Sequence, residues 1–260
     1  MKKVSLRYGY AAILVLLYGV LPQMALSGES TSGGSTAQRI LFIGNSYTQH
    51  MRPCLLEMLA NSSWHDAQLE FIARGGVRLE EHLHDATTLG KIQQGRWDKV
   101  VLQEQSQIPA LADFANSFHA AVDGFSEAAR LAGATPVLYM TWGRRNGDAA
   151  NAGELPDYPV MQARLSDAYT AAAGRNAAQL VPVGLVWSLL RQRNPVLWGS
   201  LYNSDNSHPS SKGSCVVAAT FMHVLFADRL SMTKRPSALD VAEWEVVKAA
   251  ILDANALEDD

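Results

Sequence analysis

The 260-residue sequence has few cysteines, little net charge and no nucleotide-binding signature, and each shortage excludes a class of protein. Its two cysteines form no cluster and no HExxH motif occurs, so the usual signatures of a zinc site are missing. A formal net charge of −3 gives the chain no reason to bind nucleic acid. Neither a Gly-x-Gly-x-x-Gly nor a Gly-x-x-x-x-Gly-Lys-Ser/Thr loop occurs. We therefore expect no metal, no organic cofactor and no nucleic-acid partner.

The hydrophobic run near the N-terminus is short. Residues Ala11 to Leu21 are almost wholly apolar, which gives about 11 residues where a membrane span needs about 20. Basic residues precede the run, and the small residues of Ala25-Leu26-Ser27 follow it. This pattern predicts a cleaved signal peptide over residues 1–27 rather than an uncleaved anchor. We expect export to the periplasm or the medium, with no stable membrane anchor afterwards and a net charge that falls from −3 to −6, because the signal carries three positive charges.

Residues 28–38 are rich in Ser, Gly and Thr and are predicted to form a flexible leader. Residues 39–260 then form one domain without internal repeats. Their pattern predicts strands at 39–44, 69–73, 97–103, 136–142 and 180–183, with helices at 46–60, from about 79, and at 111–131, 158–173, 209–226 and 238–254. Alternating strands and helices predict a three-layer α/β/α fold around a parallel sheet, in which ligands bind at the carboxyl ends of the strands.

Two polar motifs stand at the two ends of this pattern. An apolar strand runs into Gly44-Asn45-Ser46, and Asp205-Asn206-Ser207-His208-Pro209 lies about 160 residues later. A serine at the start of a helix is often only an N-cap. Together with Asp205 and His208, however, Ser46 completes the nucleophile, base and orienting carboxylate of activated-serine chemistry.

These two segments resemble the first and last motifs of the SGNH (GDSL-type) hydrolase superfamily, and the resemblance extends over most of residues 38–225. It implies a flavodoxin-like SGNH fold and an ester hydrolase. Ser46 would be the nucleophile, His208 the general base and Asp205 the residue that orients His208. The backbone N–H of Ser46 would donate to the oxyanion, because the first N–H groups of a helix are unpaired.

Two further oxyanion donors follow from the resemblance. The second motif of the family supplies a glycine, which Gly76 matches best, with Gly75 as the alternative. The third motif supplies an asparagine that this chain lacks; here the segment reads Leu102-Gln103-Glu104-Gln105-Ser106. A glutamine side chain can donate similarly, and we expect Gln105 to do so because it lies nearer the carboxyl end of the strand than Gln103, the alternative and a candidate substrate contact.

Other residues at this rim are candidate substrate contacts. The indole of Trp142 could stack on a sugar, the guanidinium of Arg144 could hold a carboxylate, and Tyr202 approaches the catalytic loop. Core packing and surface charge remain the default interpretations for these side chains. His82 and His84 diverge on a helix, so we do not expect them to bind a metal together. We expect His82 on a solvated helix face, and lining of the pocket is the alternative.

The sequence therefore predicts an exported serine esterase that hydrolyses short-chain O-acyl esters, with acetylated carbohydrate as the preferred substrate class. A lipid ester hydrolase or lysophospholipase, an O-acyltransferase and an inert glycan-binding domain are the alternatives. Cys54 and Cys215 lie about two turns into the helices after the two motifs. In an exported protein they could form a disulfide, or they could remain buried free thiols.

Overall fold

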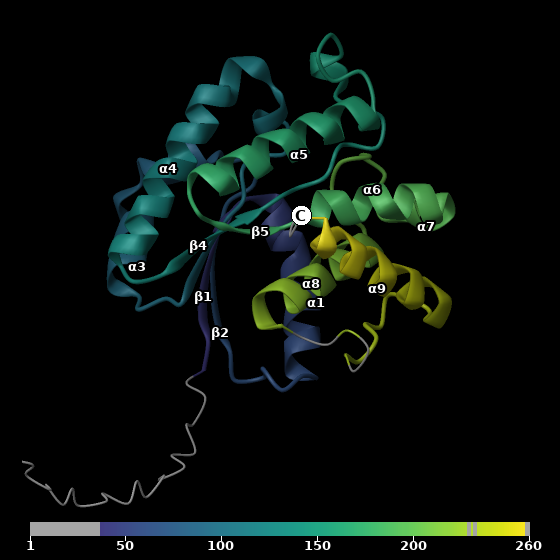
Figure 1. Cartoon of the computed structure of the whole chain (residues 1–260), viewed down its shortest axis with the longest axis horizontal. Helices are drawn as coiled ribbons and strands as arrows, with labels where there is room; N and C mark the ends of the chain where they lie inside the picture. The colour runs from purple at the N-terminus through teal and green to yellow at the C-terminus, as the bar shows by residue number, and fades with distance from the viewer. Residues whose placement is uncertain (1–36, 228–229, 231–232, 258–260) are drawn as a thin grey trace, which may run out of the picture. The chain divides into compact units, whose positions relative to one another are not determined.

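The computed structural model describes residues 37–227, 230 and 233–257, so the predicted signal peptide and residues 28–36 of the leader lie outside it. Five parallel strands form one sheet in the order β2-β1-β3-β4-β5, and Figure 1 shows this sheet between the helices. The strands are β1 (Arg39–Gly44), β2 (Gln68–Ala73), β3 (Lys99–Leu102), β4 (Thr135–Tyr139) and β5 (Gln179–Val181). The α-helices are α1 (Ser46–Ala60), α2 (Leu79–Leu83), α3 (Ala86–Gln94), α4 (Ala115–Leu131), α5 (Tyr158–Arg175), α6 (Val183–Arg193), α7 (Pro195–Ser200), α8 (Ser211–Phe226) and α9 (Val241–Ala256), with short 3-10 turns η1 (Ile108–Ala110), η2 (Ala112–Phe114) and η3 (Ala149–Asn151).

Hydrophobic cores form on both faces of the sheet. In β1, Ile40 and Phe42 point into the core shared with α1, α6, α8 and α9, whereas Leu41 and Ile43 point into the core shared with α3, α4 and α5. A strand buried on both faces reads as a continuous apolar run, which is why its sequence shows no polar alternation. The two helical layers around the sheet are visible in Figure 1 and confirm the predicted three-layer α/β/α fold.

The strand register brings the carboxyl ends of the strands to one edge. Gly44 lies opposite Ala73, and Ile43 lies opposite Leu102, which in turn lies opposite Leu138. The loops after β1, β2, β3 and β4 therefore start side by side. This edge is where a doubly wound sheet places its ligands.

Two parts of the chain differ from the predicted elements. The segment predicted as a helix from residue 111 contains the 3-10 turn η2, and α4 begins only at Ala115. No helix was predicted between residues 184 and 208, which contain α7 and all of α6 except its first residue. Helix α6 begins at Val183, directly after Pro182. The predicted strand at 180–183 included this first residue of α6, so the start of the helix was not recognised.

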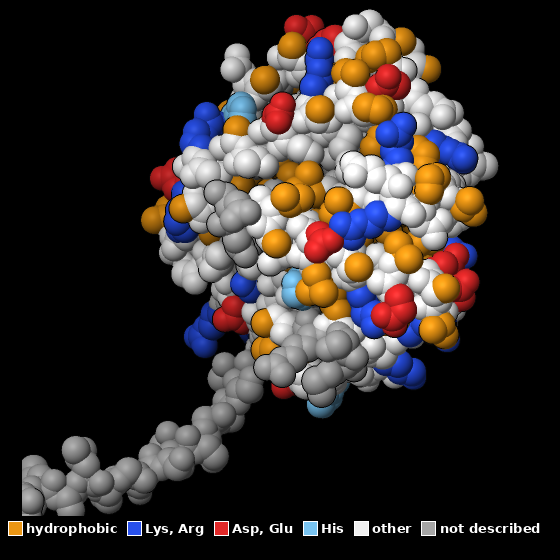
Figure 2. All heavy atoms as spheres, turned by 45° about the vertical axis from the view of Figure 1, so that its right-hand side comes forward, with side chains coloured by type: hydrophobic (Ala, Val, Ile, Leu, Met, Phe, Trp, Pro, Cys, Tyr) orange, Lys and Arg blue, Asp and Glu red, His pale blue; other side chains and the backbone are white. Residues whose placement is uncertain are grey.

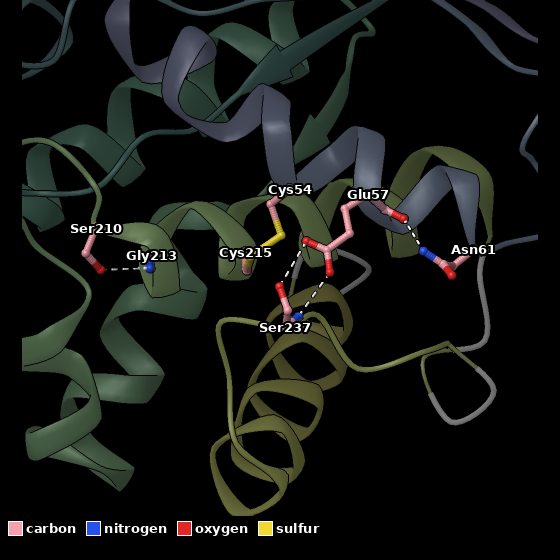
Figure 3. Close-up of a disulfide and its surroundings, with 7 residues drawn as sticks. All are labelled: Cys54, Glu57, Asn61, Ser210, Gly213, Cys215 and Ser237. Atoms are coloured by element: carbon pink, nitrogen blue, oxygen red, sulfur yellow. Dashed lines mark hydrogen bonds between the residues drawn. A yellow bond between two sulfur atoms is a disulfide. The ribbon is translucent and has the colours of Figure 1, made fainter.

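Helices α1 and α8 pack against each other, and a disulfide joins them. Cys54 and Cys215 are bonded with their Cα atoms 5.3 Å apart (Figure 3).

No helix in the described ranges is long and apolar enough to cross a membrane. Positive and negative side chains are interspersed over the face drawn in Figure 2, in keeping with the small net charge.

Candidate active site

The side chains of Ser46, His208 and Asp205 meet at the carboxyl edge of the sheet. The Oγ atom of Ser46 lies 2.8 Å from Nε2 of His208, across 162 positions of sequence. The Nδ1 atom of the same ring lies 2.5 Å from Oδ2 of Asp205. Ser46 is the first residue of α1, whose N-cap is Asn45. The structure thus brings together the three side chains that the sequence singled out.

The electrostatics of the site favour a charged Asp205. Partial burial opposes the charge, but hydrogen bonds from the His208 ring and from the backbone N–H groups of Ser207 and His208 lower the pKa of the Asp205 carboxyl. Because a carboxylate only accepts hydrogen bonds, Nδ1 of His208 carries the proton. Its Nε2 is then free to accept the proton of Ser46, as a general base requires.

Backbone hydrogen bonds hold the loop that carries the acid and the base. The N–H of Asn203 donates to the carbonyl of His208 at 2.8 Å and closes the loop on itself. Asn206 has a φ of +59°, a left-handed conformation that asparagine tolerates better than most residues. Its carbonyl accepts the N–H of Arg145 at 2.8 Å, which ties the loop to the segment after β4.

A buried aromatic stack supports the same loop. The ring of Trp142 lies between Tyr47 and Trp187, with centroids 4.4 and 4.3 Å away. Trp142 donates its Nε1–H to the carbonyl of Ser207, whose hydroxyl lies 2.9 Å from that of Tyr47. The prediction that Trp142 stacks on a substrate is wrong, because its side chain is fully buried. Tyr202 is also wrong as a substrate contact, because it is buried and donates to the carbonyl of the residue after Trp142.

The side chain of Gln103 holds the nucleophile loop through hydrogen bonds. Its Oε1 accepts hydrogen bonds from the N–H of Asn45 at 3.0 Å and from Oγ1 of Thr48 at 2.9 Å, and its Nε2 donates to Oδ1 of Asn45. Gln103 is fully buried, so the prediction that it touches substrate is wrong. The approach is so close that a Cβ on Gly44 would lie 2.6 Å from Oε1 of Gln103. A glycine is therefore needed at position 44.

Gly76 lies in an exposed turn beside the nucleophile loop. Its φ of +72° is a conformation that glycine adopts without steric cost. A hydrogen bond joins this turn to the nucleophile loop: Nδ2 of Asn45 donates to the carbonyl of Val77 at 3.2 Å. The turn of the predicted donor Gly76, which includes Gly75, is thus tied directly to the residue that precedes Ser46.

Gln105 is the more accessible of the two glutamines. Its side chain is partly exposed, and Oε1 accepts the N–H of Gln107 at 3.1 Å. This bond fixes the carboxamide while its Nε2 group stays available as a donor. Gln105 therefore remains our predicted oxyanion donor.

Glu104 is a buried acid between the second and third motif loops, and its role was not predicted from the sequence. Its Oε1 accepts the N–H of Gln105 at 2.6 Å and the N–H of Leu79, the first residue of α2, at 3.1 Å. Burial raises the pKa of Glu104 to about 7, against the opposing effect of these two hydrogen bonds. One carboxyl group thus joins the two loops that carry the proposed oxyanion donors.

Arg144 lies at the rim, where protein acceptors occupy its guanidinium. The Nη1 group forms an ion pair with Asp148 at 2.9 Å, and Nη2 donates to Oγ of Ser106 at 3.2 Å and to Gln107. These bonds use the groups that would hold a substrate carboxylate. The role of Arg144 in binding substrate stays a prediction.

Two histidines take positions that the sequence did not predict. His82 is fully buried, so the expected solvated face is wrong; its Nε2 donates to the carbonyl of Gly44 at 2.9 Å, and burial lowers its pKa. His50 lies with its ring centroid 5.0 Å from that of His208. Its spacing of four residues from Ser46 was the signal that could have identified it, since such residues share a helix face. Among the residues that the structure describes, no three His, Cys, Asp or Glu side chains gather to hold a metal ion.

The chain is similar to proteins of known structure. No family model matches the chain, and no curated protein matches it. An SGNH hydrolase-type protein from Slackia heliotrinireducens is 35% identical, with a TM-score of 0.62 over 73% of this chain and 100% of that one. A DUF4886 family protein from Bacteroides uniformis is 17% identical, with a TM-score of 0.66 over 86% of this chain and 97% of that one. An acetyl xylan esterase is 15% identical, with a TM-score of 0.51 over 70% and 97% of the two chains. The last two likenesses show a shared fold.

Proposed function

Because this chain belongs to the SGNH hydrolases and is a carboxylic ester hydrolase, we propose that it cleaves O-acyl esters through an acyl-enzyme intermediate on Ser46. The observation that carries the proposal is the 2.8 Å contact between Oγ of Ser46 and Nε2 of His208, with Asp205 behind the ring. His208 takes the proton of Ser46 as the oxygen attacks the ester carbonyl. It then gives that proton to the leaving alcohol, and a water molecule repeats the sequence to release the acid.

The negative charge that develops on the carbonyl oxygen needs hydrogen-bond donors. We assign the N–H groups of Ser46 and Gly76 and the carboxamide of Gln105 to this role. Each such donor contributes about 100- to 1,000-fold in rate when it is fixed in advance. The bonds that Asn45 and Glu104 make to the two neighbouring loops provide this fixation.

For the substrate we propose a short acyl group, preferably acetyl, on a carbohydrate. Two observations support this choice: the N-terminal sequence has the pattern of an export signal, and an acetyl xylan esterase shares the fold. We also propose that residues 1–27 are removed and that residues 39–260 act outside the cytoplasm.

A chain-length series tests the esterase proposal. The parent should hydrolyse p-nitrophenyl acetate faster than the octanoate, and Ser46→Ala should lose at least about 1,000-fold in kcat. Full activity in Ser46→Ala would overturn the assignment of the nucleophile. A preference for octanoate would favour the lipid ester alternative. Transfer of acetyl to an added sugar in place of hydrolysis would identify an acyltransferase.

A further inference from the structure

A cleft of about 330 Å³ lies beside the catalytic histidine, because His50 lines the cleft and also lies next to the ring of His208. One wall is helix α1, the other is the start of α8 with the end of the catalytic loop, and residues 237–238 close the far side. Its volume lies at the lower end of the range of small-molecule sites. The disulfide between Cys54 and Cys215 forms part of its floor, with Glu57 and Ser237 beside it (Figure 3).

The lining of α1 shows where the cleft begins. His50, Cys54 and Glu57 line it at spacings of four and three residues, which place them along one face of the helix. Ser46 lies one turn before His50 on that same face. At 1.5 Å per residue, the cleft starts about 6 Å from the nucleophile and ends about 16 Å from it. His50 also lies against the ring of His208, so the cleft opens beside the general base.

The chemistry of ester cleavage decides which part of the substrate lies there. His208 must deliver its proton to the oxygen of the leaving alcohol, so the alcohol lies next to the imidazole. The carbonyl oxygen faces the donors at Gly76 and Gln105, which follow β2 and β3 rather than α1. Resting on the proposed esterase function, we propose that this cleft binds the alcohol portion of the ester and that this portion is a neutral carbohydrate.

The polarity of the lining favours a polyol. Half of the twelve lining side chains carry hydroxyl, amide or carboxylate groups, namely Asn203, Ser210, Ser211, Ser214, Ser237 and Glu57. The Glu57 carboxylate accepts hydrogen bonds from the N–H and hydroxyl of Ser237. The negatively charged Glu57 carboxylate repels a phosphate, which disfavours a lysophospholipid head group. It accepts hydrogen bonds from sugar hydroxyls instead.

A variant that fills the cleft tests this assignment. Ser211 is exposed at the start of α8, and Ser211→Trp places an indole in the cleft without touching the triad. We expect Ser211→Trp to lower kcat/KM for an acetylated xylo-oligosaccharide at least about tenfold. This factor corresponds to the loss of one or two hydrogen bonds between the sugar and the cleft. Its kcat/KM for ethyl acetate should stay within about twofold. The matched control is Leu131→Trp, on the exposed end of α4, which should change neither.

Each other outcome is also decisive. The proposal is overturned if Ser211→Trp leaves kcat/KM unchanged for both substrates. It is also overturned if Ser211→Trp lowers kcat/KM by the same factor for both. If the parent cleaves a lysophospholipid faster than the acetylated oligosaccharide, the alcohol is a phosphate-bearing lipid and the carbohydrate assignment is wrong. Failure of the parent to cleave any ester counts against the proposed function alone. In that case calorimetric titration with the unacetylated oligosaccharide judges the cleft: binding that Ser211→Trp abolishes supports it, and no binding refutes it.

Discussion

Replacing Glu104 with glutamine is predicted to stabilise the protein above neutral pH and to change its stability little in acid. Glu104 is buried, and its pKa rises from 4.5 to about 7 in the folded state because burial penalises the charged carboxylate. Below pH 4.5 the carboxyl is neutral in both folded and unfolded chains. Between pH 4.5 and 7 the unfolded chain releases the proton while the folded chain retains it, so the free energy of unfolding decreases with rising pH.

The magnitude follows from the size of the shift. Each unit of pKa corresponds to 1.36 kcal/mol, so the decrease amounts to about 3 kcal/mol once the pH exceeds 7. Glutamine keeps a carbonyl oxygen for the N–H groups of Leu79 and Gln105 but does not titrate. The difference in free energy of unfolding between Glu104→Gln and the parent should therefore grow by about 3 kcal/mol from pH 4.5 to pH 8.

Urea unfolding of the two proteins at both pH values measures this difference, and the subtraction cancels the titration of all other groups. Glu104→Leu is the matched control: it removes the acceptor and does not titrate, so it should be about 1–3 kcal/mol less stable than Glu104→Gln at either pH. A difference between Glu104→Gln and the parent that does not change with pH would show that Glu104 is ionised in the folded protein, and the reasoning would be refuted.

Three further predictions concern the catalytic acid, the disulfide and the nucleophile loop. Asp205→Asn should lower kcat about 1,000- to 10,000-fold with little change in KM, because the wrong tautomer of the imidazole would form; steady-state kinetics with normal activity would contradict this. Replacing Cys54 and Cys215 with serine should lower the free energy of unfolding by about 2–5 kcal/mol, since the bond closes a loop of 161 residues; an unchanged urea midpoint would exclude that contribution. Gly44→Ala should reduce both kcat and stability, because its Cβ would meet two side-chain oxygens at 2.5 and 2.6 Å, whereas Gly75→Ala has open space around it and should retain the fold; equal melting temperatures and rates in the two variants would refute this.

The strand β1, the helix α1 and the loop from Asp205 to His208 could be predicted because local patterns specify them. An apolar run buried on both faces ends at a glycine, and a helix start follows. In a parallel sheet this is enough to place a serine at the carboxyl edge.

Burial of the rim residues could not be predicted, because it depends on which elements cover them. Trp142 follows a strand on the expected edge, but α6 supplies Trp187, which stacks on it and closes it from solvent. Because α6 was not predicted, the choice between core packing and a substrate contact stayed open for Trp142. His82 is similar: its helical spacing is local, but the contact that buries it is with the carbonyl of Gly44, 38 positions away.

The central claim is that the hydroxyl of Ser46 is activated by the ring of His208. Labelling the protein with a fluorophosphonate and mapping the modified peptide by mass spectrometry tests it most directly. The account predicts one adduct, on Ser46, formed at least about 1,000-fold more slowly when His208 is replaced by alanine. An adduct on another serine, or an equal rate of labelling in His208→Ala, would contradict it.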